Sequence, residues 1–599
     1  MIYHCEDHTC NYWDEGEKLP ERCPQCGRKL LRANEADMTG DDWTALGNTL
    51  WDAEASDKKR MVDCFRKAAY LGSAWGVCNL GICMEQGNGV EADPVQAFWL
   101  YQQAVEMGSL NAVCCLGVCY EYGIGTAPDA EKAAELYCKA AEYGSPRGQM
   151  LLARAFHDGI GVEADAAEAV HWVRAAAYQR YGEGMHRLGV CYEYGDGVEQ
   201  NWERAVHWFR EAAESGVSAA MTDLGWCYEK GCGVEQSWEQ AFSWYRRGAE
   251  CGNLQSMHNL GYCYEKGYGV EQSWEQAFSW YRRVAECGNP VSMSNLGLCY
   301  KRGYGVEQNW QEAVKWYEQG AQCGHLQSMN NLAYCYEYGE GVEQNEERAL
   351  YWYRRGAEAG SDYCMYCLGW NYSNGEGVEQ NMTEAIRWYT AAAEGGNADA
   401  MHNLGWLYDH GEGVEQDMKK AICWYERAAE QNHPAAMNSL GECYAMGRGV
   451  PRDLETAMEW YRRAAELGEA MADYNMGWHL EQAGKLSEAY AHYRKAADGN
   501  DDSAWWALGR FYENGVVVAQ DGKEARRCYE TGEKLGSVKC KMRLARCKLL
   551  GIGGRRAKKA GLDLCRQALE LAKESSEKED YGYEAEMNLL RRTIAENES

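Results

Sequence analysis

Four cysteines near the start of the sequence have a spacing that suits metal binding. Cys5, Cys10, Cys23 and Cys26 form the pattern C-x4-C-x12-C-x2-C within a short polar segment. Paired thiolates bind Zn²⁺ in tetrahedral sites, and Gly27 lets the backbone turn beneath the second pair. Because so short and polar a segment has no hydrophobic core, we expect one structural zinc ion to fold it.

The ligand set leaves alternatives. His8 lies three residues after Cys5 and could replace Cys10, since C-x4-C stands where C-x2-C is usual. A segment without metal is another alternative. Iron would make the segment redox-active, but no flavin or haem motif lies nearby. Residues 1–37 resemble a zinc ribbon or the related rubredoxin-like fold.

Other cysteines recur at fixed places in the sequence, which holds 28 Cys. One set lies two residues after the second member of a Leu-Gly or Leu-Ala pair: Cys83, Cys119, Cys191, Cys227, Cys263, Cys299, Cys335, Cys443 and Cys547. A second set is Cys251, Cys287 and Cys323. We interpret both as small apolar residues in tight helix packing, with redox sensing as the alternative. The start of the chain has no signal peptide, so we expect a cytoplasmic protein with reduced thiols.

Enzyme motifs do not accompany these residues. The sequence lacks H-E-x-x-H, G-x-S-x-G and G-x-x-x-x-G-K-[ST], and its 13 His have no paired ligand spacing. The sequence therefore predicts no catalytic residues and a protein that is not an enzyme.

A repeated element must position all of these residues. The Leu-Gly or Leu-Ala pair recurs every 36 residues from Leu80 onwards, and Met476 takes the place of Leu in a late copy. Shorter steps flank this array, so we expect about fifteen repeats. The first repeat, residues 41–72, and the repeat near residues 476–508 both lack the G-x-G-V segment, which predicts an irregular repeat at 476–508.

Each repeat has the pattern of two short helices. In residues 256–289, Met257, Leu260 and Tyr264 have helical spacing, and paired glycines then reverse the chain. Ser273 suits the N-cap of the second helix. The residues equivalent to Ser273 are Asn201, Ser237, Asn309, Asn345, Asn381 and Asp417.

The repeated pattern resembles the Sel-one-like repeat, a relative of the tetratricopeptide repeat. The motif is A-x-x-L-G-x-x-Y-x-x-G-x-G-V, followed by a capping residue and A-x-x-W-Y-x-x-A-A-E-x-G. The resemblance implies an all-α fold, a right-handed α-solenoid superhelix over residues 38–575 with the first helix of each repeat on the concave side. Residues 576–599 are expected to form a capping helix. The resemblance also implies a role as scaffold or adaptor.

An aromatic column follows from this arrangement, because the residue after each Leu-Gly pair should point into the concave face. We predict that its members contact a partner: Trp226, Tyr262, Tyr334, Trp370 and Trp406. Nearby acids should attract basic residues of that partner: Glu229, Glu265 and Glu337. The alternative is that the rings pack between repeats. Polar residues two positions before the Leu, such as His258 and His402, lie in the same face.

Charge limits the kind of partner. Lys and Arg number 61 and Asp and Glu 91, which gives a net charge of −30. Such a field repels phosphate backbones, so we expect neither nucleic acid nor an anionic membrane to bind. The sequence has no stretch of 18 apolar residues, so it predicts no membrane-spanning helix. The expected partner is a protein or peptide with basic residues.

The sequence thus predicts a scaffold or adaptor that binds a protein segment. One alternative is a β-lactam hydrolase, an activity credited to some secreted members of the family, although the missing signal peptide and catalytic motif oppose it. The other is a sensor whose zinc or thiols respond to oxidants.

Overall fold

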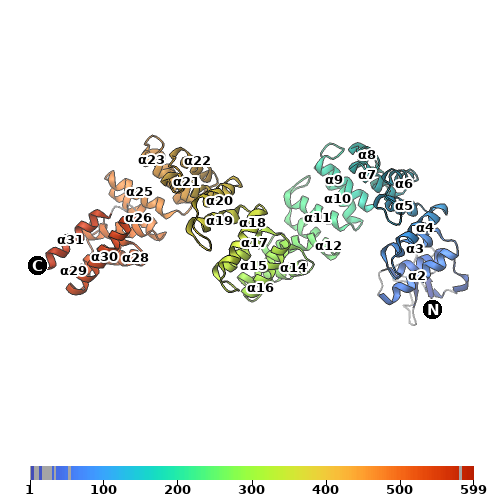
Figure 1. Ribbon diagram of the computed structural model, residues 1–599, viewed down its shortest axis with the longest axis horizontal. Coiled ribbons are helices and arrows are strands. Elements are labelled where there is room, and N and C mark those ends of the chain that lie inside the picture. Colours follow the sequence, from blue (N-terminus) through green and yellow to red (C-terminus); the bar gives the residue numbers. More distant parts are fainter. Residues whose placement is uncertain are drawn as a thin grey trace. The chain divides into compact units, whose positions relative to one another are not determined.

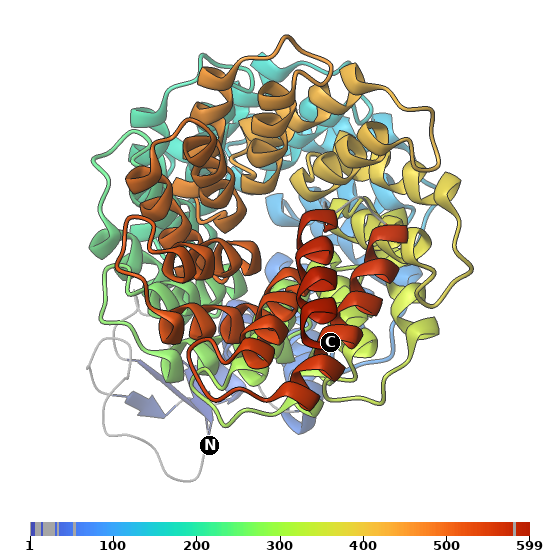
Figure 2. The same cartoon turned by 90° about the vertical axis from the view of Figure 1, so that its left-hand side faces the viewer.

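The computed structural model describes residues 2–5, 13–15, 30–32, 35–51, 55–578 and 583–598. The chain divides into two compact units, Met1–Gln308 and Asn309–Ser599. Within each unit, consecutive antiparallel helices stack side by side (Figure 1). In Figure 2 the orange and red helices of the second unit face the viewer.

Two kinds of helix alternate along the described residues. The first helices of the repeats, called A helices, are α1 (Gly40–Thr49), α3 (Ala74–Gln86), α5 (Leu110–Tyr122), α7 (Pro146–Asp158), α9 (Gly182–Tyr194), α11 (Ser218–Lys230), α13 (Leu254–Lys266), α15 (Pro290–Arg302), α17 (Leu326–Tyr338), α19 (Asp362–Asn374), α21 (Ala398–His410), α23 (Pro434–Met446), α25 (Ala470–Gln482), α27 (Asp502–Asn514) and α29 (Val538–Leu550). The second helices, called B helices, are α2 (Ala55–Tyr70), α4 (Pro94–Glu106), α6 (Ala130–Glu142), α8 (Ala166–Tyr178), α10 (Trp202–Glu214), α12 (Trp238–Glu250), α14 (Trp274–Glu286), α16 (Trp310–Gln322), α18 (Glu346–Glu358), α20 (Met382–Glu394), α22 (Met418–Glu430), α24 (Leu454–Glu466), α26 (Leu486–Asp498), α28 (Gly522–Lys534) and α30 (Lys558–Lys578). A last helix is α31 (Glu584–Glu598). The predicted α-solenoid of about fifteen repeats is therefore confirmed.

A small sheet precedes the helices. Strands β1 (Ile2–Cys5), β2 (Trp13–Glu15) and β3 (Leu30–Arg32) form an antiparallel sheet in the order β2-β1-β3. Tyr3 of β1 pairs with Asp14 on one side and with Arg32 on the other. A short 3-10 helix, Glu35–Asp37, follows the sheet.

Caps define where the helices begin and end. The Ser273 hydroxyl accepts a hydrogen bond from the Gln276 backbone N–H at 3.3 Å, at the start of α14. Every equivalent residue named above as an N-cap has this role in the structure. At the end of α13, Gly267 has φ 74° and donates its N–H to the Cys263 carbonyl, a left-handed cap that favours glycine.

One contact recurs in many of the hairpins, and α11–α12 shows it well. Tyr245 is fully buried, and a Cβ at Gly225 would lie only 2.6 Å from its ring, so the helices meet there at closest approach. The Tyr245 hydroxyl donates to a Glu229 carboxylate oxygen at 2.8 Å. Burial, and then this carboxylate, raise the pKa of Tyr245. Tyr and Glu are joined in the same way in Tyr101–Glu85, Tyr137–Glu121, Tyr281–Glu265, Tyr353–Glu337 and Tyr529–Glu513.

The two sets of cysteines differ in environment. All nine members of the first set are buried, with at most 2% of each exposed, which confirms that they pack inside the hairpins. Burial raises the pKa of Cys263 to about 12, so its thiol stays protonated. The packing interpretation is wrong for the second set, because Cys251, Cys287 and Cys323 are exposed C-caps of B helices.

The irregular repeat is also present. Residues 483–485 alone connect α25 to α26, whereas residues 267–273 connect α13 to α14. The shorter connection has no room for the G-x-G-V turn, as the sequence predicts.

The first prediction concerns a glycine of that turn. Gly269 has φ +69°, and an added Cβ would collide with the Trp238 carbonyl oxygen. Gly288 has φ +90°, but nothing lies within 4 Å of its added Cβ. Gly288→Ala should cost about 1 kcal/mol from backbone strain alone. Gly269→Ala should cost about 1–3 kcal/mol more from the collision. Thermal denaturation of the two variants checks this, and equal melting temperatures would contradict it.

Candidate protein-interaction surface

In the first unit, two residues of the predicted aromatic column lie partly open. Trp226 of α11 is half-buried, with its ring 5.8 Å from that of Trp202. Tyr262 of α13 is 37% exposed, with its ring 5.9 Å from Tyr268 and the Lys266 ammonium 5.8 Å from its centre. Neighbouring aromatic rings hold both side chains in place, while part of each surface meets solvent.

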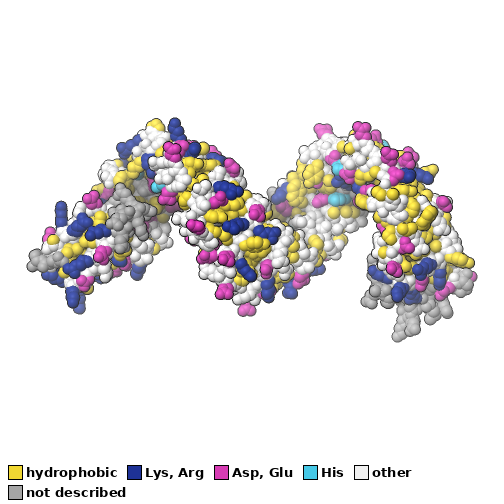
Figure 3. Space-filling view, viewed as in Figure 1, with side chains coloured by type: hydrophobic (Ala, Val, Ile, Leu, Met, Phe, Trp, Pro, Cys, Tyr) yellow, Lys and Arg dark blue, Asp and Glu magenta, His cyan; other side chains and the backbone are white. Residues whose placement is uncertain are grey.

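In the second unit, three column residues are similar. Trp370 of α19 is 44% exposed and Trp406 of α21 is 38% exposed. Trp406 stacks on His410 at 4.4 Å, and Tyr334 of α17 is half-buried against Tyr338 at 4.6 Å. In Figure 3, hydrophobic side chains form patches between charged ones on both units. Rings that stay this open are available to a partner.

The predicted glutamates have a structural role that the sequence pattern did not reveal. Glu229 accepts the hydrogen bond of Tyr245 on one carboxylate oxygen, and Lys230 lies 2.8 Å from the other. Only 15% of the Glu229 side chain is exposed. The equivalent contacts join Glu265 to Tyr281 and Lys266, and Glu337 to Tyr353. These carboxylates therefore hold their own hairpins, and burial raises the pKa of Glu337.

The polar residues two positions before the Leu join neighbouring repeats. Thr222 and Ser256 share a hydrogen bond at 2.6 Å, and His258 and Ser292 share one at 2.8 Å. In the second unit, Asn475 donates its amide to the Asn438 side chain at 3.0 Å. The A-helix face thus consists of a polar seam that holds repeats together and, beside it, the aromatic column.

Sequence reasoning missed that arginines also occur in this column. The same position holds Arg154 in α7, Arg510 in α27 and Arg546 in α29. Arg154, with Arg147 and Arg187, lines a cavity of about 570 Å³ in the first unit. The signal was available in the sequence, because the column can be followed to both ends of the array.

The predicted zinc ligands cannot be placed together. Cys5 is the last residue of β1, whereas Cys10, Cys23, Cys26 and the alternative ligand His8 lie outside the described residues. Among the residues that are described, no group of three or more His, Cys, Asp or Glu could hold a metal ion. The zinc site stays a prediction.

Comparison with protein families identifies the repeat. The Sel1 repeat model matches thirteen stretches of the sequence, which run from residue 76 to residue 537. The chain belongs to the Sel1 repeat family. The matched stretches are 76–109, 112–145, 146–181, 182–217, 218–253, 254–289, 290–325, 326–361, 362–397, 398–433, 434–469, 470–501 and 504–537. Sel1 repeat proteins generally mediate protein–protein interactions and are generally non-catalytic scaffolds.

Solved structures of Sel1 repeat proteins resemble this chain. One is c5321, a protective antigen present in uropathogenic Escherichia coli strains, with 32% identity and a TM-score of 0.57 over 75% of this chain and 97% of that one. Another is a Sel1 repeat protein from Oxalobacter formigenes, with 27% identity and a TM-score of 0.43 over 51% of this chain and 89% of that one. No curated protein matched the sequence. Within the described residues, no helix is both long and apolar enough to cross a membrane.

The second prediction separates exposed rings from packed ones. Trp370→Ala and Trp406→Ala should each cost about 1 kcal/mol or less, since half-open rings leave little cavity. Tyr389→Ala and Tyr425→Ala remove rings that are 2% and 1% exposed, and each should cost about 3–5 kcal/mol. Melting temperatures of the four full-length variants test this. Tryptophan variants that melt as low as the tyrosine variants would show that the column serves packing.

The third prediction concerns pH. Burial, and then neighbouring His433, lower the pKa of His402 to about 4, against about 6.5 in an unfolded chain. As pH falls from 7 towards 4, the unfolded state binds a proton that the folded state does not, so stability is lost. His402→Asn places there the residue found at the equivalent positions Asn330 and Asn438. Its melting temperature should fall less than that of the unaltered protein between pH 7.5 and 5. An equal fall in melting temperature for the variant and the unaltered protein would contradict this prediction.

Proposed function

We propose that this Sel1 repeat chain is a non-enzymatic scaffold or adaptor that binds a protein segment on its A-helix face. The observation that carries the proposal is the exposure of Tyr262, Trp370 and Trp406, while the Leu beside them, Leu260, Leu368 and Leu404, is at most 1% exposed. The repeat needs the leucine for its core. It does not need the aromatic ring, because Leu298 occupies the same position in α15.

The rings suit recognition of a peptide or protein segment. Trp and Tyr offer large apolar contact area at a small cost in conformational entropy, and they dominate binding energy at many interfaces. Neighbouring rings such as Tyr268 and His410 already limit the rotation of Tyr262 and Trp406. A surface prepared in this way loses little entropy on binding.

A partner segment with basic residues is part of the proposal. The support is the net charge of −30, which attracts a cationic segment and speeds its association. Glu229 and Glu265 contribute to this field, but the direct hydrogen bonds of their carboxylates go to Tyr245 and Tyr281. We therefore expect the aromatic contacts to set affinity and the charge to set the association rate.

The fourth prediction tests the aromatic column in partner binding. The double variant Trp370→Ala/Trp406→Ala should lose at least tenfold in affinity for a partner isolated with the unaltered chain, about 1.4 kcal/mol or more. The control is Tyr351→Ala, which removes a ring 52% exposed on α18, a B helix. The control should bind as the unaltered chain does. Equal loss in both variants, or in neither, would refute binding through the column.

We also propose a structural zinc site held by Cys5, Cys10, Cys23 and Cys26. Its support is the spacing of four thiols and the antiparallel strands β1, β2 and β3 in the same segment. Four thiolates around one ion make a closed site, which contributes to folding rather than to catalysis.

The fifth prediction is a metal content of about one zinc per chain. Elemental analysis of purified protein measures it, and Cys23→Ser/Cys26→Ser should abolish binding. The helical circular dichroism signal should persist in that variant, because the repeats have cores of their own. Zinc retained at one equivalent in the double variant would disprove this ligand set.

A further inference from the structure

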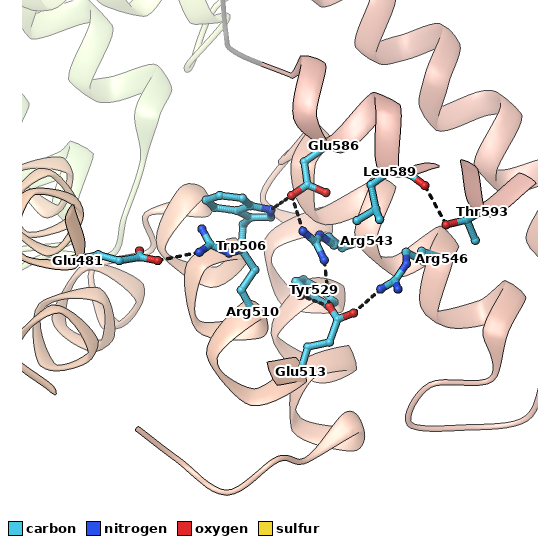
Figure 4. A network of polar contacts seen from close by, with 10 residues as sticks. All are labelled: Glu481, Trp506, Arg510, Glu513, Tyr529, Arg543, Arg546, Glu586, Leu589 and Thr593. Atoms are coloured by element: carbon cyan, nitrogen blue, oxygen red, sulfur yellow. Dashed lines mark hydrogen bonds and ion pairs between the residues drawn. The ribbon is translucent and has the colours of Figure 1, made fainter. Parts of the chain in front are cut away.

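The last helix of the chain lies against the A-helix face of the second unit. Helix α31 contacts both α29 and α30, and its Glu586 reaches Trp506 of α27. Figure 4 shows Glu586 pointing from α31 toward Trp506 and Arg543. Residues of α27, α29 and α30 thus hold α31 in place.

A buried carboxylate anchors α31 to this face. Glu586 is 6% exposed, and one of its oxygens accepts hydrogen bonds from Arg543 at 2.7 Å and from the Trp506 indole at 3.2 Å. A charge-assisted hydrogen bond away from water is among the stronger polar contacts in proteins. A carboxylate that is nearly removed from solvent is costly unless it is paired. Because Arg543 and Trp506 both donate to this position, it favours an acid.

Apolar side chains complete the contact. Met587 and Leu590 of α31 are buried, and Ile594 is partly buried beside them. These residues lie on one side of α31, at a spacing of three and four residues. They pack in one cluster with residues of α29 and α30: Met542, Ala545, Leu549, Cys565 and Ala568. The bound helix is therefore amphipathic, with an acid at the start of its apolar stripe.

The receiving face is cationic. Lys539 lies over the Trp506 ring at 5.3 Å and over the Tyr583 ring at 5.8 Å. The Arg510 guanidinium lies 4.6 Å from the centre of the Trp506 ring. It also forms an ion pair with the Glu481 carboxylate at 2.7 Å. Besides Glu586, the carboxylates near the four cations of this face are Glu481, Glu513 and Asp502. The four cations are Arg510, Lys539, Arg543 and Arg546.

Helix α31 does not satisfy the face completely. The Nε atom of Arg543 is buried, and it has no acceptor among the described residues. Buried donors without acceptors destabilise the bound arrangement. An occupant with more acceptors could therefore compete with α31.

We propose that the surface formed by α27, α29 and α30 is a binding site for an acidic amphipathic helix, which α31 occupies within the chain and which a partner helix of the same chemistry occupies in its place. The partner helix carries Glu or Asp, followed by apolar residues one, four and eight positions later, as Glu586 is followed by Met587, Leu590 and Ile594. This inference rests on the proposed scaffold function and names one of its sites and the partner chemistry there.

The test supplies α31 from outside the chain. The probe is a fluorescent peptide of residues 583–598, added to the full-length protein carrying Glu586→Arg, which opposes Arg543. The matched control is Glu584→Arg, because Glu584 lies on the same helix but is exposed. The peptide should bind the Glu586→Arg protein at least tenfold more tightly than it binds the unaltered or the Glu584→Arg protein. A peptide carrying Glu586→Gln should bind the Glu586→Arg protein at least tenfold more weakly.

A second measurement keeps the test decisive if Glu586→Arg disturbs folding. Hydrogen exchange of the α31 amides is followed in the unaltered chain. Excess peptide should speed that exchange, because the peptide displaces α31, whereas peptide with Glu586→Arg should leave it unchanged. If the peptide binds no variant and leaves exchange unaltered, α31 is a terminal cap and the inference is overturned. The aromatic-column test would be unaffected by that result, since Trp370 and Trp406 lie on other helices.

Discussion

The contact between a buried tyrosine ring and a glycine closes the regular hairpins, and the other features of the repeat depend on it. In α11–α12 the Tyr245 ring occupies the space that a side chain at residue 225 would fill. The close approach buries a phenol hydroxyl, which must find an acceptor. Glu229 supplies it from one turn further along α11. Where Phe209 replaces the tyrosine, Glu193 has no such donor, and burial raises its pKa.

This arrangement also decides which side chains are left for binding. Leu260 and Cys263 of α13 face the interior of the hairpin, and His258 is bonded to the next repeat. Tyr262, the residue after the Leu-Gly pair, is left partly in solvent. A change of residue type at such a position alters the surface without altering the repeat. The chain can therefore carry Trp406 in one repeat and Arg510 in another on the same scaffold.

The aromatic column and the arginine-rich surface suit different ligands. Aromatic rings such as Trp370 offer apolar contact to many segments. The cluster around Arg543 instead selects a carboxylate, and α31 provides one in Glu586. A repeat protein with both kinds of surface can hold more than one segment, which is what a scaffold requires. Beside that cluster, Arg510 and Arg546 occupy the same position of the repeat as Trp370.

The sequence by itself determined the period of 36 residues, the helix pairs and the N-caps such as Ser273, because these depend on local spacing and on backbone hydrogen bonding. It also placed Trp370 and Trp406 in one column. Only the tertiary structure decided what Glu229 does, because its partner Tyr245 lies 16 residues away on another helix. Only the tertiary structure showed that Cys251 is exposed while Cys263 is buried. The sequence predicted a capping helix over residues 576–599 but not its contact with α27, since Glu586 meets Trp506 across 80 residues and only the folded stack brings them together.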